Sequence, residues 1–355
     1  NIIPIAPFRT LFGNLNKPFN VVVLSCNDRK FINNDSLWYD IARQAKRGEI
    51  DYIFHIGDQV YLDHNKWYGS TDSAYFYAKE LYDNKDTNLV ENMREIIKDE
   101  YRLTFAHPLN QVLSRVPNLM ILDDHEIFNN FGWRQYDEFE TIFEKQARFV
   151  YYLYQRQLWE DIDFNNFEKT PDEFKYIVLN DIGFVWTEYR ASRAWHGHKE
   201  EAFIDKKQHE LFMSNIYNNT GLVWISTNPV ILFSTQYTRY FSAIDDFNEY
   251  WCYNNEDELL DLLDHIRNNT KDLFMIGGDV HAAAMYEVYY KGKPFAMQLI
   301  SSGVEQISTP PERIPIINHV ANIDNSYKRD YCFFPKYVAH ERNYSLVKFF
   351  KNGLR

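Results

Sequence analysis

Four short segments of the chain concentrate side chains that can bind metal ions. Each has at least one carboxylate beside imidazole, amide, phenol or thiol groups: SCND (25–28), HIGDQVYLD (55–63), DDHEIFNN (123–130) and GGDVH (277–281). Such donors suit hard or borderline cations, and a thiolate at Cys26 or a tyrosinate at Tyr61 favours iron or zinc at one position. One segment alone could be a turn, and Cys26 alone a small core residue. Four of them in one chain predict a metal site.

Each segment follows a short apolar run that is typical of a buried strand. In open α/β sheets, ligands bind at the carboxyl ends of the strands. We therefore expect these strands to share one sheet with their C-terminal ends at one edge: 20–26, 51–57, 118–122 and 272–277. Asp58 and Asp279 should then lie within roughly 10 Å of each other, the reach of a shared two-metal site.

Carboxylates crowded at one edge repel each other unless cations compensate their charge. Two cations about 3.5–4 Å apart, bridged by one carboxylate, form the usual arrangement for in-line phosphoryl displacement. Asp58 follows Gly57, which lets the backbone turn sharply, and it is our candidate for the bridge.

The rest of the chain alternates apolar runs with amphipathic stretches. Helices are expected at 35–49, within 71–115, and at 136–160, 205–218 and 255–269; strands are expected at 174–181, 183–190, 222–228, 230–236, 295–302 and 344–350. The sequence has no repeat and no low-complexity linker, so one α/β domain over 1–355 is the simplest account. We expect its core at about 20–305, a helical insertion at about 65–115 and a C-terminal extension at about 306–355.

Composition limits the classes of partner. The formal net charge is −12, which disfavours a broad basic face for duplex nucleic acid. No apolar run reaches the roughly 18 residues that a membrane-spanning helix needs. The three cysteines do not make a disulfide framework. The chain starts at Asn1, which leaves open a removed signal peptide; compartment and oligomeric state stay open as well.

The order of the four segments resembles the PhoD-like metallophosphatases, a branch of the calcineurin-like phosphoesterase superfamily. Weaker matches are TEYRASR (187–193), DKKQHELF (205–212) and LISSGVE (299–305), so the similarity runs from about residue 20 to 305. The resemblance implies a four-layer αββα sandwich with two central sheets, a helical insertion after the second core strand and a multi-metal site at the strand ends. It implies divalent or trivalent metal ions, foremost calcium and iron, with zinc or manganese as alternatives.

The resemblance also assigns roles to residues. The positions that match the family's metal ligands are Cys26, Asp58, Tyr61, Asp279 and His281. Asp124 stands where the superfamily has a ligating asparagine, and Asn129 could supply that amide instead. His125 matches the catalytic histidine near the substrate phosphate.

The chain departs from the family pattern in two places. Glu188 replaces the usual aspartate before Arg190, and GGDVH offers one histidine where many members have two. WHGH (195–198) does contain a His-x-His pair, but it follows an arginine-containing loop instead of a strand end, and we interpret His196 as substrate-facing or structural. Arg190 and Arg193 could hold a phosphate as planar forks or could pair with acids at the surface.

The leading functional prediction is hydrolysis of a small phosphate mono- or diester by a metal-activated water. His125, held by Glu126 or Asp124, would stabilise charge or protonate the leaving oxygen. Two alternatives stay open. One is a phospholipase D-type diesterase that acts on lipid headgroups. Its pocket would be shaped by the 65–115 insertion and by aromatic residues, which make up 17% of the chain. The other is a relative that binds metal without turnover.

Overall fold

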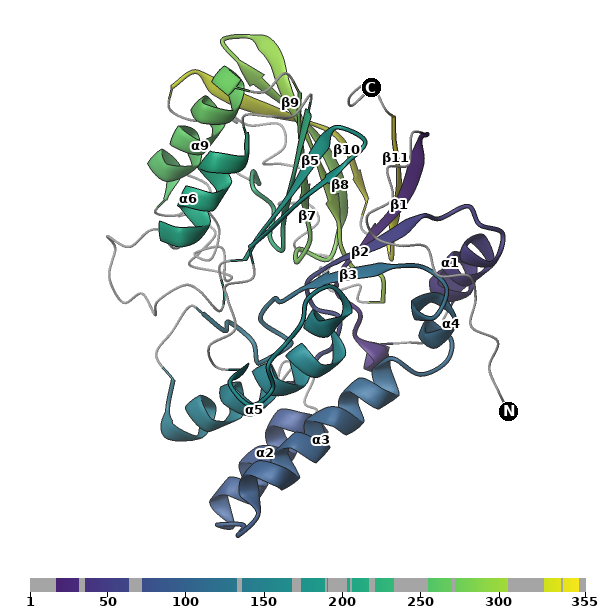
Figure 1. Ribbon diagram of the computed structural model, residues 1–355, viewed down its shortest axis with the longest axis vertical. Helices are drawn as coiled ribbons and strands as arrows, with labels where there is room; N and C mark the ends of the chain where they lie inside the picture. Colours follow the sequence, from purple (N-terminus) through teal and green to yellow (C-terminus); the bar gives the residue numbers. More distant parts are fainter. Residues whose placement is uncertain are drawn as a thin grey trace.

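The computed structural model of the chain is an α/β sandwich in which two β-sheets pack face to face between outer helices (Figure 1). The structure describes residues 17–31, 36–63, 72–132, 136–167, 174–188, 190, 203–204, 206–216, 221–232, 255–269, 272–305, 329–339 and 341–350.

The smaller sheet has the strand order β11-β1-β2-β3. Three of its strands run parallel: β1 (Phe19–Leu24), β2 (Tyr52–Ile56) and β3 (Asn118–Ile121). The fourth, β11 (Ser345–Phe349), pairs antiparallel with β1. Every residue of β2 and β3 is buried, as expected of parallel strands that are covered on both faces. Two helices, α1 (Ser36–Lys46) and α4 (Leu109–Leu113), pack on the outer face through a cluster that contains Trp38 and Val22.

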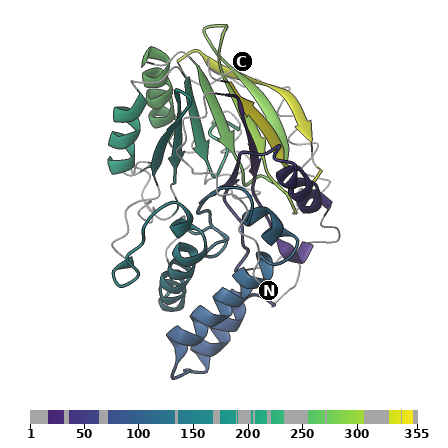
Figure 2. The same ribbon diagram turned by 45° about the vertical axis from the view of Figure 1, so that its right-hand side comes forward.

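The larger sheet has the strand order β10-β8-β9-β7-β6-β5-β4. Four of its strands run parallel: β5 (Ile182–Thr187), β6 (Gly221–Ser226), β7 (Leu273–Gly277) and β9 (Lys293–Ser301). Antiparallel strands complete it: β4 (Lys175–Leu179), β8 (Ala283–Tyr290) and β10 (Tyr331–Ala339). Its outer face is covered by α6 (Lys206–Asn215) and α9 (Glu256–Asn269), as the turned view in Figure 2 shows.

The inner faces of the two sheets share one hydrophobic core. Phe54 of β2 makes edge-to-face contacts with Phe184 and Trp186 of β5, with ring centroids 5.8 and 5.1 Å apart. Aromatic pairs of this kind stabilise a core beyond the area that they bury. The order helix, sheet, sheet, helix is the αββα sandwich that the resemblance implied.

The expectation of one sheet for all four site-bearing strands is wrong. β1, β2 and β3 lie in the smaller sheet, whereas β7 lies between β6 and β9 in the larger one. These strands are apolar on both faces, so their sequences do not show which neighbour each one pairs with.

A helical layer extends from the C-terminal side of β2 and β3 (Figure 1). It consists of α2 (Ala74–Asp83), α3 (Leu89–Thr104) and α5 (Glu138–Tyr154), which bury a common cluster of aromatic and aliphatic side chains. A capping box starts α5, in which the side chains of Asp137 and Glu140 each accept the other's backbone N–H. These helices confirm the helical patterns at 71–115 and 136–160. None of the helices that the structure describes is long and apolar enough to cross a membrane.

One strand prediction fails where it can be checked. Residues 230–232 are irregular, and 233–236 lie outside the described residues. The backbone N–H of Ile231 donates to the side-chain oxygen of Gln298 at 2.8 Å, and the amide nitrogen of Gln298 donates to the Ile231 carbonyl. A buried side chain therefore satisfies this backbone in place of a neighbouring strand.

Candidate metal centre

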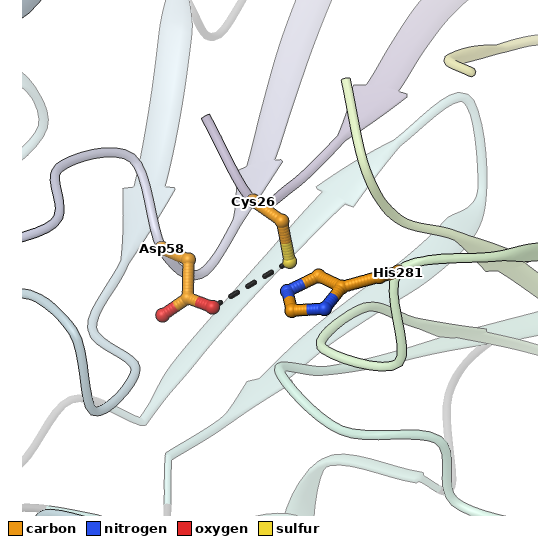
Figure 3. A group of neighbouring side chains, drawn as sticks. All are labelled: Cys26, Asp58 and His281. Atoms are coloured by element: carbon orange, nitrogen blue, oxygen red, sulfur yellow. Dashed lines mark hydrogen bonds between the residues drawn. The ribbon is translucent and has the colours of Figure 1, made fainter. Parts of the chain in front are cut away.

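The four polar segments meet where the C-terminal ends of β1, β2 and β3 in the smaller sheet lie close to the C-terminal end of β7 in the larger sheet. Glycine allows the close approach: a Cβ on Gly278, after β7, would lie 2.6 Å from the Ser25 hydroxyl and 2.9 Å from the Ile56 carbonyl oxygen. Figure 3 shows Cys26, Asp58 and His281 pointing toward one another from the loops after β1, β2 and β7.

Among the residues that the structure describes, the donor atoms form three overlapping groups, and within each group they all lie within 4.8 Å of one another. The groups are Cys26, Asp58 and His281; Asp58, Asp124 and His125; and Asp58, Asp123, Asp124 and Asp279. Asp58 and Asp279 are therefore well inside the expected limit of roughly 10 Å. Asp58 is the residue common to all three groups, which is the position that a bridging carboxylate would occupy.

The backbone at the strand ends is held in an unusual conformation. The φ angles of Cys26, Asp58, Asp279 and His281 are 58°, 56°, 67° and 55°, in the left-handed region that non-glycine residues seldom adopt. Such strain persists only where the surrounding structure imposes it, and it clusters at functional sites. Here the left-handed backbone directs the side chains of four candidate ligands into one small volume.

Cys26 and Tyr61 both contact the candidate bridge. The Tyr61 hydroxyl donates to Asp58 Oδ2 at 3.1 Å and lies 3.1 Å from His281 Nε2. The Cys26 Sγ lies 3.5 Å from Asp58 Oδ2 and 3.1 Å from the Ser302 hydroxyl. Burial and the neighbouring carboxylates raise the pKa of both the thiol and the phenol. A cation would lower both pKa values, because it favours the anionic ligand.

The carboxylates around Asp58 carry more negative charge than the protein itself compensates. Burial, followed by the charges of neighbouring acids, raises the pKa of Asp58 despite the opposing effect of His125. Burial also raises the pKa of Asp123 to about 6, although Arg190 opposes this. Asp123 Oδ1 accepts a hydrogen bond from Arg190 Nε at 2.6 Å, while the buried Oδ2 has no hydrogen-bond partner. Because a cation would satisfy both the charge and this oxygen, the residues fit a metal site.

His125 has a different partner from the one that the sequence suggested. Its Nδ1 lies 2.7 Å from Asp63 Oδ1, and its ring stacks on Tyr61 with centroids 4.1 Å apart. Neither Glu126 nor Asp124 holds the ring at this nitrogen. Burial lowers the pKa of His125. The charges of Asp63, Asp124 and Asp58 raise it by more, so the pKa of His125 lies well above its ordinary value.

Arg190 is buried beside the acids, which corrects the expected alternative of surface pairing. Its Nε bonds Asp123, its second terminal nitrogen lies 3.5 Å from Asp124 Oδ1, and the other donates to the Phe131 carbonyl at 3.4 Å. Burial and Arg190 act in opposite directions on Asp124, whose pKa is lowered overall. Arg193 and His196 lie outside the described residues.

The first three polar segments lie in a region of the chain that matches a known protein family. Residues 21–157 match the model of the PhoD-like phosphatase family. This match confirms the resemblance drawn from the motifs, and it stops before GGDVH. No curated protein matches the chain.

Two of the solved structures that match the chain each cover 94% of its length. The one titled "Structure of PhoD" is 14% identical, with a TM-score of 0.65, and the match covers 94% of this chain and 64% of that one. The chain thus spans just under two thirds of that protein and shares its fold. The other, "GAP50 the anchor in the inner membrane complex of Plasmodium", is 10% identical with a TM-score of 0.43, covering 94% of this chain and 81% of that one.

Several residues of the candidate site were not among those that the sequence singled out. Asp123 and Asp63 lie inside the recognised segments, where extra acids were the only signal. Ser302 accepts the backbone N–H of His281 at 2.8 Å, and Asn228 donates to Asp279 Oδ2 at 3.0 Å. Ser302 lies in LISSGVE (299–305), one of the weaker family matches, whereas Asn228 has no sequence signal because it reaches the site through the fold.

Asp124 and Asn129 are the two candidates for one ligand position. The Asp124 carboxylate belongs to two of the three donor groups, and it accepts the backbone N–H of Asn130 at 2.6 Å. Asn129 lies on the same loop and is half-buried, and its backbone N–H donates to Asp63.

Proposed function

We propose that the chain hydrolyses phosphate mono- or diesters with the help of metal ions at this site. The proposed ligands are Cys26, Asp58, Tyr61, Asp124, Asp279 and His281, with Asn129 as the alternative to Asp124. The observation that carries the proposal is that one carboxylate, Asp58, belongs to all three groups of converging donor atoms. The family match supports a phosphoesterase in general, and the metals and the substrate belong to the proposal.

Bound metal ions would neutralise phosphoryl oxygens and lower the pKa of a bound water, for zinc to about 7. The protein's own contribution begins with His125. Its contact with Asp63 assigns the Nδ1 proton to that hydrogen bond, so Nε2 is the nitrogen that could give a proton to the leaving oxygen. Tyr61 stacks on the ring and holds its plane.

Arg190 acts in this proposal on the acids that it contacts. The guanidinium is 3% exposed and contacts both Asp123 and Asp124. It offsets part of the charge of both carboxylates. Contact with the substrate phosphate is left to Arg193 and His196.

The test is a panel of substrates with matched metals. Protein treated with chelator, then supplied with calcium and iron, should hydrolyse bis(p-nitrophenyl) phosphate or p-nitrophenyl phosphate, and chelated protein should not. Asp58→Asn should lose this activity while the protein stays folded. Metal binding without hydrolysis of either compound would favour the non-catalytic relative. Release of headgroups from phospholipid vesicles, in the absence of nitrophenyl hydrolysis, would favour the phospholipase D-type reaction.

A further inference from the structure

Glu126 is a fully buried acid that joins two of the ligand-bearing loops. Its Oε1 accepts the backbone N–H groups of Gln59 at 2.5 Å and Val60 at 3.2 Å. Its Oε2 accepts those of Asp58 at 3.1 Å and Asp123 at 2.9 Å. Three of these amides belong to the loop after β2, and the fourth belongs to the loop after β3.

The arrangement requires a group that only accepts hydrogen bonds. All four partners are backbone N–H donors, and an ionised carboxylate is the side chain that offers acceptors on both oxygens. The three consecutive amides of residues 58–60 converge because Gly57 and Asp58 have φ angles of 100° and 56°. A concave run of N–H groups of this kind binds anions. Glu126 therefore stabilises the left-handed turn that aims the Asp58 side chain.

The two loops also brace each other in the opposite direction. Asp58 Oδ1 accepts the backbone N–H of His125 at 3.3 Å, while Glu126 accepts the backbone N–H of Asp58. A side chain of each loop thus holds the backbone of the other, as in the capping box at a helix start. The spacing between the loops is restricted further at Gly57, where a Cβ would lie 2.7 Å from the Asp123 Cβ.

We propose that Glu126 is a positioning residue that pre-organises Asp58 and Asp124 for metal binding. The residue contacts the loops that carry the ligands and acts through them. This inference rests on the proposed metal site, because its effect is measured as metal affinity. Outer partners that orient metal ligands typically change affinity by about 10–100-fold when they are lost.

The experiment compares Glu126→Gln with a matched control. In either orientation, the glutamine amide nitrogen would face two backbone N–H groups, so two of the four amides lose their acceptor: Gln59 and Val60 in one orientation, Asp58 and Asp123 in the other. Glu258 of α9 is the control, because it also accepts two backbone N–H groups, from Phe203 at 2.7 Å and Ile204 at 3.3 Å, on the outer side of the larger sheet. Chelator-treated wild type, Glu126→Gln and Glu258→Gln are each melted without and with Mn²⁺, and the Mn²⁺ Kd of each is measured by titration. Wild type is also melted with Ca²⁺ and with Fe²⁺.

We expect Glu126→Gln to bind Mn²⁺ about 10–100-fold more weakly than wild type, so that Mn²⁺ raises its Tm by less. Glu258→Gln should lower Tm with and without Mn²⁺ by the same amount and keep the wild-type Kd. An equal Kd and an equal rise in Tm for Glu126→Gln and wild type would overturn the proposal, because the carboxylate would then stabilise only the fold. If Glu126→Gln does not fold, Glu126→Asp applies the same criterion: one methylene shorter, it cannot reach both loops, and a wild-type Kd in that variant would overturn the proposal. No rise in Tm for wild type with Mn²⁺, Ca²⁺ or Fe²⁺ would instead remove the metal site and this inference with it.

Discussion

Asp58→Asn should make the metal-free protein more stable while reducing the stability that metal ions add. Asp58 is fully buried, and its carboxylate accepts hydrogen bonds from the Tyr61 hydroxyl and the backbone N–H of His125. Asparagine keeps a similar shape and one of the two oxygens. It removes the negative charge of Asp58. Burial and the nearby acids disfavour that charge, which is why they raise the pKa of Asp58.

The size of the effect follows from the spacing of the charges. Donor oxygens of Asp58 and Asp123 lie within 4.8 Å, where two like charges repel by roughly 3.5 kcal/mol at an effective dielectric constant of about 20. Asp124 adds to this repulsion, whereas His125 and Arg190 offset part of it. We therefore expect the metal-free variant to gain about 1–3 kcal/mol at pH 7.

Urea unfolding of chelator-treated protein measures this difference, and repeating it with calcium and iron measures the gain from metal. The variant should be the more stable protein without metal, and wild type should be the more stable one with metal. Such a reversal is hard to produce by a packing defect, which would lower stability in both conditions. A metal-free variant less stable than wild type, or one that gains as much from metal, would refute the charge argument.

Three further predictions follow from the same site. Metal-free protein should become more stable as pH falls from about 7 to 5: burial raises the pKa of Asp123 to about 6, and an acid whose folded pKa is raised binds its proton more tightly in the folded state; flat urea midpoints across pH 5, 6 and 7 would contradict this. Cys26→Ser should reduce iron per chain and any visible charge-transfer band while calcium is retained, as elemental analysis and absorption spectra would show; unchanged iron would leave Cys26 as a core thiol. Asp63→Asn should lower kcat by roughly 100-fold or more at unchanged metal content, because the Nδ1–H of His125 loses its anionic acceptor; a wild-type kcat would remove His125 from proton transfer.

Sequence alone predicted most of the secondary-structure elements and the segments that carry the candidate site. Apolar runs marked β1, β2, β3 and β7, because a strand buried on both faces has almost no polar residues. The acids and histidines at the ends of these runs predicted a metal-binding edge, and the donor groups around Asp58 lie there. These features are local, so they can be read from short stretches of chain.

Tertiary structure alone decided how the strands are shared between the sheets and which side chains support the candidate ligands. β7 joins the larger sheet and faces the smaller one, a choice that its uniformly apolar sequence does not encode. Asp63 reaches His125 across 62 residues of sequence, and Arg190 reaches Asp123 across 67. The roles of Asp63, Arg190 and Glu126 depend on these contacts. An acid or an arginine has the same sequence signal at a surface and in a buried site, and only the packing of the two sheets and their loops determines which partner it meets.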